Sequence, residues 1–134
     1  MTMISAYDRA IATTLVEALC EYGLTGYLSQ YGEHCTEDWF SDNELNRAGF
    51  WATGGATKVC IGHPDLSGWV IKVGYTENVH KDYATYEYNV YCMAEDAGLA
   101  RYFPETEYLG EFCGRPFYVQ QMAQCDEDHV TSDW

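Results

Sequence analysis

The sequence predicts an α+β domain: a five-stranded antiparallel sheet with one long inserted helix, preceded by a mostly helical N-terminal segment. Apolar residues recur at helical spacing in the first part of the chain, whereas short β-branched and aromatic runs separated by glycine turns follow. A long helical pattern over residues 77–97 falls between the third and the fourth of these runs. With 134 residues, the chain is long enough for one domain with a single core.

The N-terminal segment is expected to hold two helices and a further helical turn. Apolar positions over residues 6–22 follow helical spacing, and a second short helix is expected over residues 26–31. Ser41 and Glu44 fit a capping box, so a helical turn is expected to start near Asp42.

Five strands are expected in the remainder of the chain, over residues 50–52, 57–61, 68–73, 107–109 and 116–121. On the long helix, we expect Tyr83, Tyr86 and Tyr91 to pack on the sheet and Tyr88 to face outward. The expected organisation is a helical segment over residues 1–48 that packs on the domain, the sheet domain over residues 49–123, and an acidic C-terminal tail over residues 124–134.

Acidic residues dominate the charge of the chain. There are 21 acidic and 7 basic side chains, and the net charge is −14. The acids are spread along the chain, so the surface is expected to repel nucleic acid and anionic membranes. Such a surface attracts basic protein surfaces, including the grooves that proteins use to hold DNA. The alternative interpretation is that the acidity only keeps the protein in solution.

The cysteines and the N-terminus bear on the cellular compartment. The six cysteines include no C-x-x-C pair, and neither they nor the four histidines have the spacing of a metal site. No signal peptide and no apolar stretch long enough for a membrane span is evident. We therefore expect free thiols, no metal and a location in the cytoplasm.

One strand carries the most specific signal. The run from Trp69 to Gly74 is apolar apart from Lys72, and burying a lysine is costly unless an anion meets it. Together with the His63-Pro64 turn, this run makes residues 49–123 resemble the amino-terminal lobe of protein kinases. The likeness extends to the early protein kinases of the autographivirus phages.

The resemblance implies roles for particular residues. Lys72 would be the lysine of the third strand, and Glu87 in the following helix would be its ion-pair partner. Gly54 and Gly55 would lie in the glycine-rich loop, and residues 120–123 would form the hinge. The G-x-G-x-x-G pattern is absent, so this is expected to be a vestigial nucleotide site. The alternative is that the ion pair only positions the helix.

The catalytic motifs of the kinase family are absent from this sequence. It contains neither H-R-D-x-x-x-x-N nor D-F-G, the segments that supply the catalytic base and the magnesium ligands. We therefore expect no enzyme activity, no catalytic residue and no cofactor, with ATP as the one alternative.

The sequence accordingly suggests a phage-type early protein that acts by binding. We expect it to inhibit a nucleic-acid-handling or defence enzyme of a bacterial host through an acidic, DNA-mimicking surface. The expected contact residues are Glu37, Asp38, Glu95, Asp96, Asp126, Glu127 and Asp128. One alternative is the nucleotide-binding half of a kinase that is completed in trans. Another is an antitoxin or regulator that docks on a kinase-like partner.

A kinase small lobe normally buries one sheet edge and the rear of its helix against a large lobe. We expect the helices of residues 6–48 to cover that surface here, or two copies of the chain to cover it by forming a homodimer.

Overall fold

The computed structural model describes residues 4–31, 36–54, 58–75 and 82–122. The elements are, in chain order, α1 (Ala6–Glu21), α2 (Leu24–Tyr31), α3 (Thr36–Asp42), β1 (Trp51–Gly54), β2 (Lys58–Gly62), β3 (Trp69–Gly74), α4 (Tyr83–Asp96), the 3₁₀ helix η1 (Ala100–Tyr102), β4 (Thr106–Phe112) and β5 (Arg115–Gln121). All five strands form one antiparallel sheet in the order β1-β2-β3-β5-β4. The predicted α+β class and the five-stranded sheet with a helix after its third strand are confirmed.

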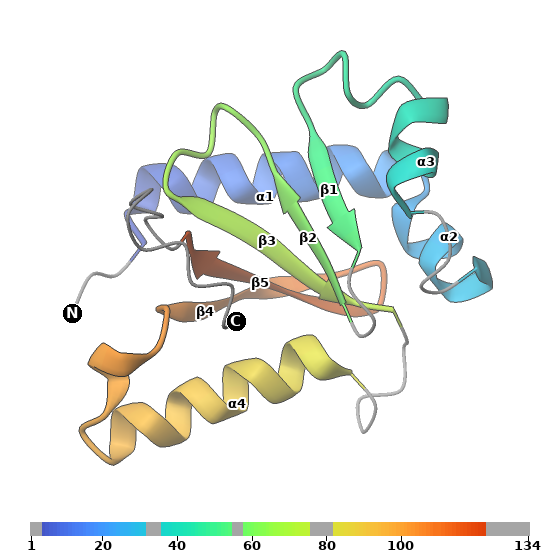
Figure 1. The fold of residues 1–134 in the computed structure, drawn as a ribbon. Coiled ribbons are helices and arrows are strands. Elements are labelled where there is room, and N and C mark those ends of the chain that lie inside the picture. Colours follow the sequence, from blue (N-terminus) through green and yellow to red (C-terminus); the bar gives the residue numbers. More distant parts are fainter. Residues whose placement is uncertain (1–3, 32–35, 55–57, 76–81, 123–134) are drawn as a thin grey trace, which may run out of the picture.

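The sheet lies between two helices (Figure 1). Alternate residues of the three central strands point to one face, where they form a core with the buried face of α1. The sheet residues of this core are Val59, Ile61, Ile71, Val73, Phe117 and Val119. The intervening residues face α4, and this second face is more polar, since it carries Lys58, Lys72 and Gln120.

The first two helices of the N-terminal segment lie where the pattern predicted them. The predicted start of a helical turn near Asp42 is wrong, because α3 ends at that residue. Glu44 has a left-handed backbone with φ of 59°, and the Leu45 amide donates to the Phe40 carbonyl, which closes the helix end. The Ser41 hydroxyl accepts a hydrogen bond from the Asn46 side chain and caps no helix start.

The orientation of α4 differs from the expectation. The buried Asp82 side chain caps the helix at its N-terminus, and the buried positions include Ala84 and Tyr91. This phase turns Tyr83 and Tyr86 away from the sheet, and they are 50% and 63% exposed. Tyr88 turns inward instead, where its ring packs 5.1 Å from that of Tyr118. The predicted packing is confirmed for Tyr91 alone.

The N-terminal helices cover only part of the surface that they were expected to cover. The helix α3 packs beside β1 at one edge of the sheet, and α1 lies on the face opposite α4 (Figure 1). The helix α4 still exposes Tyr86 and Met93 among the described residues. The expected acidic tail over residues 124–134 lies outside the described residues.

Candidate functional site

Three side chains from three elements meet Glu87 on the α4 face of the sheet. The Lys72 ammonium from β3 lies 3.6 Å from Glu87 Oε1, and the Lys58 ammonium from β2 lies 3.0 Å from Glu87 Oε2. Gln120 of β5 donates a hydrogen bond of 2.8 Å to Glu87 Oε1. The predicted pairing of Lys72 with Glu87 is therefore present, and it belongs to a larger cluster.

The environment of Glu87 keeps this side chain ionised. Burial alone raises its pKa, but the positive charges of Lys72 and Lys58 and the hydrogen bonds from Lys58 and Gln120 outweigh burial and lower the pKa. Sequence reasoning missed Lys58. The alternation of side chains along β2 could have indicated it, because Lys58 and Cys60 lie on the same face of the strand. Cys60 is opposite Lys72 in the register between β2 and β3.

An open cavity of about 640 Å³ adjoins this cluster. Its wall is mainly aromatic and apolar, and it also contains both lysines. The lining residues are Lys58, Lys72, Tyr83, Tyr86, Glu87, Val90, Tyr102, Phe103, Pro104 and Gln120. Tyr83 and Tyr86, which were expected to pack on the sheet, thus line a cavity instead.

The remaining residues expected at the vestigial nucleotide site are only partly described. Gly54 is the last residue of β1, whereas Gly55 and the residues up to 57 lie outside the described part of the chain. Gln120, the first residue of the expected hinge, is hydrogen-bonded to Glu87 and to Thr106. A role of these residues in holding a nucleotide stays a prediction.

Internal contacts engage the basic side chains. The chain has seven basic residues, of which Lys81 lies outside the described part. Each of the other six has a partner within the molecule: Arg9 binds Glu107, Arg47 binds Glu44, Lys58 and Lys72 bind Glu87, Arg101 stacks on Tyr102, and Arg115 donates to the Gly74 carbonyl. Arg47 and Arg101 are exposed despite these contacts, but exposed carboxylates outnumber them, so the described surface is predominantly acidic.

The acids expected to contact a partner do not form one patch. Glu37 and Asp38 are exposed in the first turn of α3. Glu95 and Asp96 are exposed at the end of α4, on the opposite side of the molecule (Figure 1). Asp126, Glu127 and Asp128 lie outside the described residues. The structure thus separates two of the predicted acid pairs instead of bringing them together.

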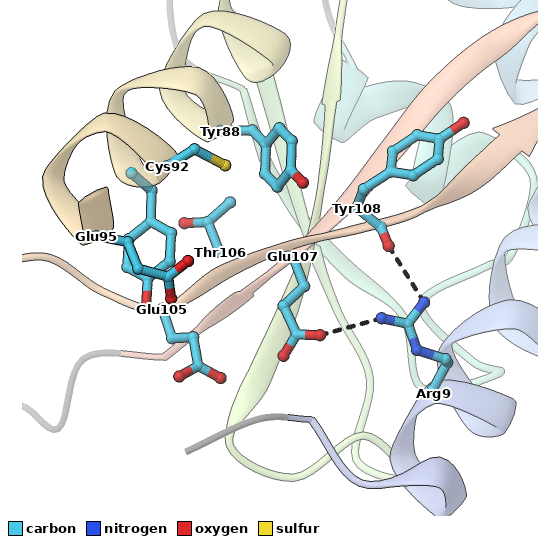
Figure 2. Close-up of a pocket in the computed structure, with 9 residues that line it drawn as sticks. Arg9, Tyr88, Cys92, Glu95, Glu105, Thr106, Glu107 and Tyr108 are labelled. Atoms are coloured by element: carbon cyan, nitrogen blue, oxygen red, sulfur yellow. Dashed lines mark hydrogen bonds and ion pairs between the residues drawn. The ribbon is translucent and has the colours of Figure 1, made fainter. Parts of the chain in front are cut away.

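A second cavity, of about 320 Å³, lies at the free edge of β4. Figure 2 shows its side chains: Arg9 comes from α1, Tyr88 and Glu95 come from α4, Thr106 to Tyr108 come from β4, and Glu105 immediately precedes that strand. Arg9 donates to Glu107 Oε1 at 3.1 Å and to the Tyr108 carbonyl at 3.1 Å. Arg9 thereby occupies part of an edge that pairs with no other strand among the described residues.

Glu105 is the unusual residue of this cavity. Its side chain is 7% exposed, and its Oε2 atom is buried without a hydrogen-bond partner among the described residues. Burial, followed by the hydrogen bond and the charge of Glu107, raises the pKa of Glu105 from 4.5 to about 7. Glu95 adds a further negative charge. Sequence reasoning missed this site, because Arg9 and Glu107 are 98 positions apart.

Comparisons with known proteins do not identify this chain: no family model, no curated protein and no solved structure matches it. Among the described segments, every helix is too short or too polar to cross a bilayer. Within the same residues, no group of three or more His, Cys, Asp or Glu side chains is arranged to hold a metal ion.

Proposed function

We propose that this chain is a non-enzymatic binding protein that occupies the basic nucleic-acid groove of a partner protein. The observation that carries this proposal is the acidity of the described surface, where Arg47 and Arg101 are the only exposed basic residues among the described ones. Exposed carboxylates are thereby left to determine the outward charge, as phosphates do on DNA. A partner that holds DNA with lysine and arginine side chains would be attracted to this surface over several ångströms.

The placement of acids at helix ends supports a functional origin of the charge. The C-terminus of a helix favours basic side chains by about 0.3–1 kcal/mol each. The last turns of all four α-helices in the described part contain no basic residue. Glu21 ends α1, and Glu95 and Asp96 end α4, so these acids oppose helix stability. Selection for a stable helix does not account for them, whereas selection for an acidic surface does.

The contact between Lys72 and Glu87 supports a kinase small-lobe origin of the scaffold. An ion pair between the third strand and the following helix organises the phosphate site of an active kinase. The sequence lacks the motifs that supply a catalytic base and magnesium ligands, so the scaffold would serve binding instead of phosphate transfer. We further propose that it is a phage-type early protein that inhibits a nucleic-acid-handling or defence enzyme in the bacterial cytoplasm.

Capture from a bacterial lysate tests the proposed function. The immobilised chain is expected to retain a nucleic-acid-handling protein at low salt and to release it when duplex DNA or high salt is added. A matched column carrying the Glu95→Lys/Asp96→Lys variant controls for charge at one end of the molecule. Retention of partners that duplex DNA does not displace would contradict the proposal.

The cavity beside Lys58 and Lys72 favours a second candidate function, the binding of a nucleotide. Two ammonium groups and an aromatic wall suit a phosphate and a base. Thermal unfolding with and without ATP and magnesium separates the two functions. A ligand at 100 times its dissociation constant would add about 2.7 kcal/mol of stability. The binding-protein proposal expects no change in the unfolding midpoint.

A further inference from the structure

The cavity at the edge of β4 has the composition of a cation site. Glu95, Glu105 and Glu107 line it, against a single basic side chain, Arg9. Glu107 is already satisfied, because one carboxylate oxygen accepts from Arg9 and the other accepts from the Ile4 amide at 2.7 Å. The acceptors that remain for a ligand are therefore on Glu95 and Glu105.

Glu105 points to a missing partner. Protonated Glu105 can hydrogen-bond to Glu107, but the ionised carboxylate cannot, and its buried Oε2 then lacks a donor that a ligand entering the cavity would supply. Burial, followed by the hydrogen bond and the charge of Glu107, raises the pKa of Glu105, and a bound cation would oppose the repulsion from Glu107 and favour the ionised carboxylate. The unpartnered oxygen therefore suits a positively charged donor in particular.

The aromatic rings around the cavity favour a guanidinium over an ammonium group as this donor. Tyr88 and Tyr108 line it with ring centroids 6.5 Å apart, and Tyr91 completes the wall (Figure 2 shows the first two). A guanidinium stacks on aromatic faces and binds carboxylates with two parallel hydrogen bonds, whereas an ammonium is more strongly hydrated. The volume of about 320 Å³ is at the lower end for ligand sites, so it admits one side chain and not a folded segment.

We propose that this cavity is a socket for one arginine side chain of the partner protein, with Glu105 and Glu95 as its carboxylate acceptors and Tyr88 and Tyr108 as its walls. The inference rests on the proposed function, because an arginine-rich DNA groove would supply the side chain. It adds a shaped contact to an otherwise diffuse attraction, and such buried contacts dominate the specificity of an interface.

Titration of the isotope-labelled full chain with short glycine-serine peptides, followed by NMR at low salt, tests the socket. One peptide carries a single arginine, and its control carries citrulline, which is isosteric and uncharged. The arginine peptide is expected to bind about tenfold more tightly and to shift the amides of residues 88–95 and 105–108. Equal binding of both peptides, no binding, or shifts confined to other residues would overturn the proposal.

Three variants test whether arginine binding depends on the carboxylates of this cavity. Glu105→Gln is expected to weaken arginine binding about tenfold, whereas Glu111→Gln removes the same charge at an exposed position of β4 and is expected to change it less than about twofold. Glu95→Gln, at an exposed position, provides a second test should the buried substitution impair folding. Equal effects of Glu105→Gln and Glu111→Gln would mean that only net charge matters, which overturns the socket.

The socket and the proposed function fail in distinguishable ways. If duplex DNA does not release the retained partner from the immobilised chain, while the arginine peptide still binds, the DNA-groove function alone is refuted. If duplex DNA releases the partner from both wild type and Glu105→Gln, but neither protein prefers the arginine peptide to the citrulline peptide, the socket alone is refuted.

Discussion

Glu105 makes the folding stability of this protein depend on pH in an unusual direction. Its pKa is raised from 4.5 to about 7, chiefly by burial and then by Glu107. The folded state therefore holds a proton that the unfolded state has already released, so stability falls as the pH rises between these two values. Below pH 4.5 both states are protonated, and above pH 7 both are ionised, so the effect is confined to this interval.

The size of the effect follows from the shift in pKa. A difference of about 2.5 pH units, at about 1.36 kcal/mol per unit, corresponds to about 3 kcal/mol between pH 4.5 and pH 8. The variant Glu105→Gln carries a neutral amide at every pH and removes this contribution. Relative to wild type, its free energy of unfolding should rise by about 3 kcal/mol over the interval, whatever constant offset the amide introduces.

Urea unfolding at several pH values between 4.5 and 8 measures this difference. Carboxylates distant from Glu105 titrate alike in both proteins, so their contributions cancel in the comparison. Glu111→Gln is the matched control, since it removes an exposed carboxylate of the same strand and should follow wild type at every pH. A constant difference between Glu105→Gln and wild type across the interval would refute the assignment of a protonated, buried Glu105.

The lysine cluster, the α4 cap and a half-buried thiol give three further predictions. Glu87→Ala leaves the Lys58 and Lys72 ammonium groups without their shared carboxylate and should lower the free energy of unfolding by about 2 kcal/mol. Lys72→Met leaves the contact between Lys58 and Glu87 in place and should lower it by about 1 kcal/mol or less; urea unfolding measures both. Asp82→Ala removes two hydrogen bonds at the start of α4 and should cost about 1–2 kcal/mol in the same assay; an unchanged midpoint would contradict the cap. Burial, followed by Cys113, raises the pKa of the Cys20 thiol to about 12, so mass spectrometry should find it unmodified after iodoacetamide treatment of the native protein at pH 8, and rapid modification would contradict this.

The sheet could be predicted because its signals are local, and the contact between Lys72 and Glu87 because the resemblance to a kinase small lobe implied it. Apolar runs with glycine turns mark the strands, and a lysine inside such a run calls for an anionic partner. The following helix supplies that partner at Glu87. Lys58 was not predicted, since its role depends on the register between β2 and β3, which the sequence does not state.

The rest of the site depends on long-range packing. The phase of α4 is set by Asp82 and by the residues that the sheet buries, so periodicity alone assigned Tyr83 and Tyr86 to the wrong side. The socket requires Arg9 of α1 to meet Glu107 of an edge strand. Nothing in the sequence near either residue indicates that contact.

The most direct test of the central claim is competition between this chain and DNA for a captured partner. Fluorescence anisotropy of a labelled duplex bound to that partner would be followed as the chain is added. The account predicts that DNA is displaced at one chain per partner, and that the Glu95→Lys/Asp96→Lys and Glu105→Gln variants displace it less effectively. A partner that binds the chain and the duplex at the same time would contradict the account.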